Sequence, residues 1–177
     1  MARLKPAVSE QDHIKGNLQA PVQLVEYGDF QCPHCGAAHP IIKEIEKFFK
    51  EKLVFIFRHF PISGSHPYAQ VAAVASEAAA RQGRFWQMHD LIYENQARLS
   101  PAALLQFAEL LKLDLKVFQK DIADQKLFEK VEANFESGLL SGVNGTPSFY
   151  INGNKYEGPY EFRSLTHAIE MAVSEHQ

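Results

Sequence analysis

The chain has 177 residues, a formal net charge of −3 and a hydrophobic fraction of 46% that includes 13 phenylalanines. This length fits one domain, and the apolar content is enough to build a substantial core. The slightly acidic balance argues against nucleic acid as the main partner, and no apolar run approaches the roughly 20 residues that span a bilayer.

The first nineteen residues are polar and show no clear periodicity, which predicts an arm that packs loosely or frays. They include basic residues but no apolar stretch and no cleavage-like site, so the sequence as written has no secretory signal. We therefore expect a cytoplasmic protein. The alternative is an exported, periplasmic protein whose signal was lost by processing or truncation.

A strand–helix–strand pattern follows the arm. Residues 22–27 are apolar and β-branched, as is typical of a core strand. Apolar residues at helical spacing predict a helix from about Pro33 to Phe49, bent at Pro40. The continuous apolar run 53–57 is typical of a strand buried on both faces. Together these elements predict a right-handed crossover that joins a parallel pair of strands.

An all-helical insertion is expected at 63–143, between a first half at 1–62 and a second half at 144–177. Five helices are predicted in this insertion, at about residues 66–81, 85–95, 100–111, 114–122 and 128–139. Ser100 and Asp114 are the expected N-caps of the third and fourth helices. Gly142 is expected to end the fifth.

The second half begins with a strand-like segment at 147–151. Asn152-Gly153 is a strong hairpin signal that leads to a short strand at 155–156, and apolar residues from Leu165 to Ala172 predict a last helix. The order βαβ, helices, ββα predicts an α/β fold. Its core would be a mixed four-stranded sheet with helices on both sides.

Cys32 and Cys35 are the only cysteines, and they lie at the predicted strand-to-helix junction with Pro33 in the first helical turn. The positive end of the helix dipole favours a thiolate at Cys32. Such a pair in a βαβ pattern is typical of a thioredoxin-like redox motif, so we interpret it as the active site. The alternatives are a buried, inert pair or a zinc site with His39, although a second ligand pair is missing.

The motifs of the chain carry a resemblance to a known family. They are C-P-H-C after a strand, a proline five residues beyond the second cysteine, a helical insertion and G-T-P before a late hairpin. From Asp12 onward, the chain resembles the DsbA-like thioredoxin-fold thiol:disulfide oxidoreductases. The resemblance implies a thioredoxin fold that exchanges disulfides with cysteine-containing polypeptides and an unidentified redox partner. It implies no bound cofactor, and the missing second ligand pair argues against a metal site. We expect a monomer without membrane insertion.

The resemblance also implies residue roles. Cys32 would be the nucleophile that forms a mixed disulfide, and Cys35 the thiol that resolves it. Pro33 and His34 lie between them and would tune the redox potential, because an imidazole close to the Cys32 thiolate stabilises the reduced form. Glu26 matches the buried acid that transfers protons to or from Cys35. The alternative for Glu26 is a solvent-exposed acid at a strand edge.

Thr146 and Pro147 match the substrate-binding loop of the family. Pro147 corresponds to its cis-proline, and the Thr146 backbone would pair with an extended substrate by strand addition. Thr146 departs from the valine of the best-known DsbA proteins and is more common in isomerase and reductase relatives. The direction of electron flow therefore stays open.

Three further polar residues lie near these motifs. Arg58 and His59 end the second predicted strand; either could reach toward Glu26 or the rim of the site, or both could be exposed charges. Asp29 is expected to be a loop residue.

Three alternative functions remain. The first is a disulfide isomerase or reductase of the same fold. The second is a non-catalytic redox-regulatory domain, since some relatives are fused to membrane transporters. The third is another enzyme on this fold, such as a glutathione-dependent transferase or 2-hydroxychromene-2-carboxylate isomerase, although that group typically lacks the full C-P-H-C pair.

Overall fold

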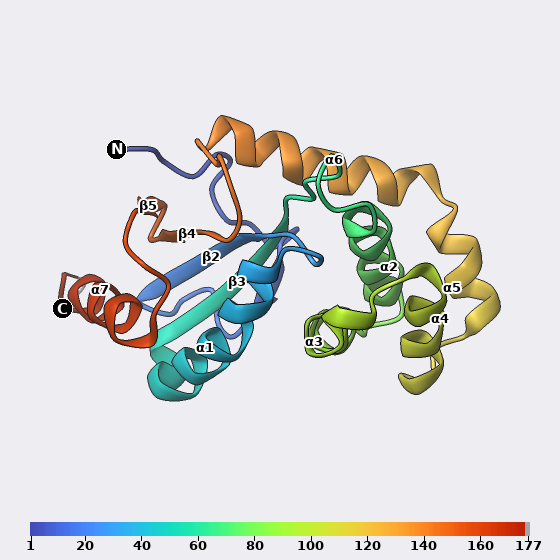
Figure 1. The fold of residues 1–177 in the computed structure, drawn as a ribbon. Helices are drawn as coiled ribbons and strands as arrows, with labels where there is room; N and C mark the ends of the chain where they lie inside the picture. Colours follow the sequence, from blue (N-terminus) through green and yellow to red (C-terminus); the bar gives the residue numbers. More distant parts are fainter. Residues whose placement is uncertain (176–177) are drawn as a thin grey trace. The chain divides into compact units, whose positions relative to one another are not determined.

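The computed structural model describes residues 1–175 and divides into two compact units (Figure 1). The sheet unit comprises Met1–Gly28, Ala37–Arg58 and the chain from Glu136 onward. The helical unit comprises Asp29–Gly36 and His59–Phe135. The segment that holds both cysteines thus belongs to the same unit as most of the inserted helices.

The sheet unit is built on five strands in the order β1-β3-β2-β4-β5 (Figure 1). The strands are β1 (His13–Lys15), β2 (Val22–Gly28), β3 (Leu53–His59), β4 (Ser148–Ile151) and β5 (Asn154–Tyr156). β1 pairs antiparallel with β3, and β4 pairs antiparallel with both β2 and β5. The two apolar segments predicted as core strands are therefore β2 and β3, at the centre of the sheet and almost wholly buried.

The predicted four-stranded sheet was wrong by one strand. β1 lies in the N-terminal arm and adds a fifth strand beside β3, with His13 opposite Phe57 and Lys15 opposite Phe55. A three-residue strand is too short to show a period of two, and its hydrogen bonds come from a distant segment. Local periodicity therefore gave no sign of it.

The expectation of a loose arm was also wrong, because the buried Arg58 binds it. Its Nε and Nη2 donate to the two carboxylate oxygens of Asp12 at 2.8 and 2.9 Å, and its Nη1 donates to the carbonyl of Pro6 and to the Tyr27 hydroxyl at 3.0 Å. Burial opposes the charge on Arg58, but the hydrogen bonds to Asp12 and Tyr27 raise its pKa above the ordinary value.

The helices largely follow the predicted positions. They are α1 (Pro33–Phe49), α2 (Ala69–Arg81), α3 (Phe85–Glu94), α4 (Pro101–Leu110), α5 (Leu115–Ile122), α6 (Gln125–Leu140) and α7 (Phe162–Ser174), with short 3-10 turns at Lys50–Lys52 and Gln96–Arg98. The side chains of Ser100 and Asp114 accept the N–H groups of Ala103 and Val117, which confirms both N-caps. Within residues 1–175, no helix combines the length and the apolar character needed to cross a membrane.

Candidate active site

The two cysteines lie where the chain leaves β2 and enters α1. Cys32 immediately precedes the helix, and its carbonyl accepts the N–H of Gly36 at 3.1 Å. Both cysteines are free thiols and both are buried, with 5% of Cys32 and none of Cys35 exposed. The predicted strand-to-helix junction is therefore confirmed. Pro33 and His34, between them, are exposed.

Asp29 is the residue of this turn that contacts both cysteines. Its main-chain N–H donates to Sγ of Cys35 at 3.5 Å, and its carbonyl accepts the N–H of Cys32 at 3.1 Å. Its buried carboxylate accepts four hydrogen bonds. Oδ1 takes the N–H groups of Gln31 and Cys32 at 2.8 and 3.2 Å, and Oδ2 takes the N–H of Ile62 and Nδ1 of His66, both at 2.8 Å. Asp29 is in a loop, as expected, but it organises that loop.

Gln96, in the 3-10 turn after α3, also holds this turn. Its Nε2 donates to the carbonyls of Phe30 and Cys32 at 2.9 and 2.8 Å. Its Oε1 and Cδ lie against Gly36, so a methyl group at Gly36 would overlap Oε1 and come within 2.9 Å of Cδ. The absence of a side chain at Gly36 therefore makes room for the Gln96 amide.

Glu26, Thr146 and Pro147 all belong to the sheet unit. Glu26 is buried on β2 opposite Phe149 of β4, so it is not the solvent-exposed acid of the alternative interpretation. The next pair along the ladder, Tyr27 and Ser148, places the Thr146–Pro147 loop directly at the end of β2. The Thr146–Pro147 peptide bond is cis, as the resemblance implies.

A hollow of about 290 Å³ lies beside this loop. It is lined from Asn144 to Phe149 on one side and by residues 155–158 and Tyr160 on the other. Its lining includes two tyrosines, Tyr156 and Tyr160, and two charged residues, Lys155 and Glu157.

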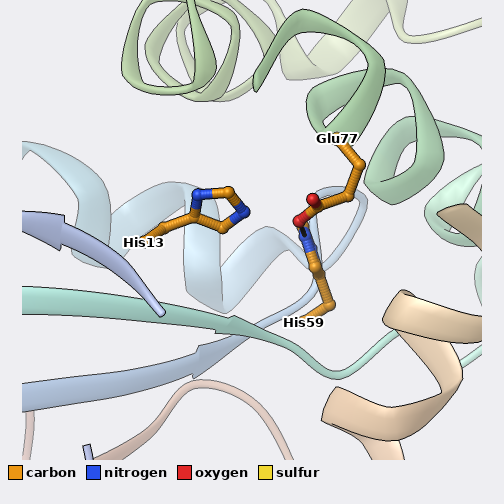
Figure 2. Close-up of side chains that lie close together, drawn as sticks. All are labelled: His13, His59 and Glu77. Atoms are coloured by element: carbon orange, nitrogen blue, oxygen red, sulfur yellow. Dashed lines mark hydrogen bonds and ion pairs between the residues drawn. The ribbon is translucent and has the colours of Figure 1, made fainter. Parts of the chain in front are cut away.

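Arg58 and His59 are both buried, so neither is the exposed charge that the sequence left open. Arg58 binds the arm as described above. Nε2 of His59 lies 2.8 Å from Oε1 of Glu77 in α2, and Figure 2 shows the two side chains directed toward one another. Oε2 of Glu77 also pairs with Nζ of Lys130 at 2.8 Å. His59 and Glu77 therefore form part of a charged cluster inside the helical unit.

Sequence reasoning missed the contributions of Asp29, His66 and Gln96. For Asp29 a local signal existed, because an acid two and three residues before free N–H groups at a helix start is a common capping arrangement. For His66 and Gln96 no local signal existed. Their partners lie 37 and 64 residues away in the chain.

The sequence profile of the thioredoxin family matches residues 8–171. The chain belongs to the thioredoxin family. A curated relative of this thioredoxin-family chain, the Na(+)/H(+) antiporter NhaA 3 of Salinispora tropica, is 43% identical over 169 residues. That match covers 96% of this chain and 26% of the antiporter, so the chain spans about a quarter of the length of that relative.

Solved structures share the fold of this chain. Oxidised BdbD from Bacillus subtilis superposes with a TM-score of 0.86 over 98% of each chain, at 23% identity. The alpha-DsbA1 protein of Wolbachia pipientis gives a TM-score of 0.85 over 97% of this chain and 95% of its own, at 22% identity. The predicted thioredoxin fold with an inserted helical block is therefore confirmed.

Proposed function

We propose that this chain is a thiol:disulfide oxidoreductase that exchanges disulfides with cysteine-containing polypeptides through Cys32 and Cys35. The observation that carries the proposal is the placement of the pair. Cys32 lies at the start of α1 in a thioredoxin fold, and Sγ of Cys35 accepts a main-chain N–H from Asp29. Both features favour thiolates, which are the reactive species in disulfide exchange.

In the oxidising direction, a substrate thiolate attacks Sγ of Cys32 in the Cys32–Cys35 disulfide. The S–S bond breaks, a mixed disulfide forms and Cys35 leaves as a thiolate, which the N–H of Asp29 stabilises. A second substrate thiolate then attacks the substrate sulfur of the mixed disulfide and releases the Cys32 thiolate. Two electrons pass from the substrate dithiol to the protein, and an unidentified redox partner reoxidises it. Reduction of a substrate disulfide is the reverse sequence, with Cys35 as the resolving thiol.

The remaining site residues are assigned supporting roles in this proposal. Glu26 exchanges protons with Cys35, and its burial on β2 is the property that suits a proton-transfer acid. Pro33 and His34 tune the potential. Thr146 and Pro147 bind an extended substrate segment, which the hollow beside their loop has room for.

The assignment of the two cysteines is tested by insulin reduction and by trapping. We expect Cys32→Ala to abolish acceleration of insulin reduction by dithiothreitol, because no nucleophile remains. We expect Cys35→Ala to accumulate a mixed disulfide with substrate on a non-reducing gel, because resolution is blocked. A mixed disulfide trapped by Cys32→Ala through Cys35 would reverse the assignment, and an inactive wild-type chain would reject the proposed function.

A redox-regulatory domain is the second candidate function. It is favoured by the match to about a quarter of a Na(+)/H(+) antiporter. A regulatory thiol pair changes state without turning over a substrate. A wild-type chain that is oxidised by glutathione disulfide but does not accelerate insulin reduction would therefore support this second function over the first.

A further inference from the structure

His66 takes no part in the disulfide exchange proposed above, but it contacts Asp29, whose N–H donates to Cys35. Nδ1 of His66 lies 2.8 Å from Oδ2 of Asp29 within the helical unit. The carboxylate of Asp29 is fully buried, whereas 20% of the His66 side chain is exposed. His66 is thus the outermost member of a short chain of contacts that ends at Sγ of Cys35.

The two carboxylate oxygens of Asp29 bind different segments of the helical unit. Oδ1 accepts the N–H groups of Gln31 and Cys32. Both belong to the turn at Asp29–Gly36, which we call the redox turn, so these two bonds move with the turn itself. Oδ2 binds the N–H of Ile62 and the ring of His66, which belong to the loop before α2. Among residues 1–175, Oδ2 is the carboxylate oxygen that fixes Asp29 to a part of the helical unit outside the turn, and His66 supplies the side-chain donor to it.

The main chain of Asp29 carries the effect to the sulfur. Its N–H donates to Sγ of Cys35, so any rotation of Asp29 changes the direction of that donor. A hydrogen bond to a charged acceptor is about twice as strong as one to a neutral acceptor. The bond therefore stabilises a Cys35 thiolate more than the sulfur of a disulfide, and it shifts the equilibrium toward the reduced protein.

We propose that His66 is a positioning residue of the redox site. By donating from Nδ1 to the Asp29 carboxylate, it keeps the N–H of Asp29 aimed at Cys35 and makes the Cys32–Cys35 disulfide more oxidising. The inference rests on the proposed function, since it concerns the same pair of cysteines. It adds a residue outside the C-x-x-C segment. His66 is partly exposed, so it can be replaced without opening the core.

The test is the equilibrium of the purified chain with glutathione. Two glutathione thiols give two electrons and two protons to the disulfide, yielding the Cys32 and Cys35 thiols and one glutathione disulfide. His66→Ala removes the donor. We expect the equilibrium constant for reduction of the protein to fall about three- to tenfold, which corresponds to about 14–30 mV at 29.6 mV per tenfold change.

Two further variants separate positioning from a general structural effect. In His66→Asn, the amide nitrogen takes the place of Nδ1 and can still donate to Asp29, so the equilibrium constant should stay within twofold of wild type. Arg81→Ala is the matched control, because it breaks ion pairs with Asp121 and Asp124 in the same unit without touching the redox turn. It should lower the thermal midpoint without moving the equilibrium constant more than twofold.

The outcomes are distinguishable. An equilibrium constant within twofold of wild type in a folded His66→Ala would overturn the inference and leave the proposed function standing. So would a His66→Asn that behaves like His66→Ala, since the hydrogen bond would then not be the cause. If His66→Ala does not fold, a change of more than twofold in the equilibrium constant of a folded His66→Asn would also overturn the inference. A wild-type chain that forms no Cys32–Cys35 disulfide at any glutathione ratio would reject both.

Discussion

Gly36→Ala is the substitution whose effect the structure predicts most sharply, because its sign depends on a second residue. Gly36 lies in the first turn of α1, where alanine is normally the better helix former by about 0.8–1.0 kcal/mol. In this protein the added methyl group would overlap Oε1 of Gln96. A glutamine side chain is normally flexible, but the Gln96 amide donates two hydrogen bonds. It cannot move away from an added methyl group without breaking them.

The size of the effect follows from those two bonds. Each typical intramolecular hydrogen bond contributes about 0.5–1.5 kcal/mol net, so displacing the Gln96 amide costs about 1–3 kcal/mol. The helix-propensity gain offsets about 1 kcal/mol of this. Gly36→Ala should therefore lower the free energy of unfolding by about 1 kcal/mol in the wild-type chain. Once Gln96→Ala has removed the clash and the bonds together, Gly36→Ala should raise the same free energy by about 0.5–1 kcal/mol.

The measurement is a double-mutant cycle by urea unfolding of the reduced chain. The wild type, both single variants and the double variant give a coupling free energy, for which we expect about 1–3 kcal/mol. Gln96→Ala alone should cost about 1–3 kcal/mol through the loss of its two bonds. Effects of Gly36→Ala that are equal in sign and size in the two backgrounds would refute the reasoning. They would show that Gln96 is not held against Gly36.

Three other variants test separate parts of the molecule. Arg58→Ala leaves the largely buried Asp12 carboxylate without its ion-pair partner and should lower the urea-unfolding free energy by about 3–5 kcal/mol, with earlier proteolysis of the N-terminal arm; a loss below about 1 kcal/mol would contradict this. Tyr150→Phe removes a 2.8 Å hydrogen bond to the Ser141 carbonyl and should cost about 0.5–1.5 kcal/mol near neutral pH. Burial raises the pKa of Tyr150 to about 12, so ionisation of this phenol in the unfolded chain removes stability as pH rises from about 10 to 12; the phenylalanine variant should lose less over that interval, and equal losses would exclude the shift. Thr146→Val keeps the shape of the loop but removes a hydroxyl, and it should make the disulfide more oxidising in glutathione with an unchanged unfolding midpoint; a more reducing couple would count against the resemblance to valine-containing relatives.

The parts of the fold that depend on neighbours in sequence were predictable. α1 begins at Pro33 because a proline suits the first helical turn, and α4 and α5 begin after Ser100 and Asp114 because those side chains accept N–H groups three residues on. β2 was readable as an apolar, β-branched segment and β3 as a continuous apolar run. β1 was not, because it is defined by its pairing with β3 and not by a pattern of its own.

In the candidate site, too, local features were predictable and contacts with distant segments were not. The C-P-H-C segment, with its thiols at a helix start, is visible in the sequence, but the orientation of the donor at Cys35 is set elsewhere. Oδ2 of Asp29 binds the loop before α2, and the Gln96 amide after α3 binds the carbonyls of Phe30 and Cys32. The redox turn accordingly belongs to the helical unit and not to the sheet that precedes it. If His66 positions the donor as proposed, chains with an identical C-P-H-C segment should differ in redox potential through residues of the loops and turns of the helical unit, and the motif alone would not fix the direction of electron flow.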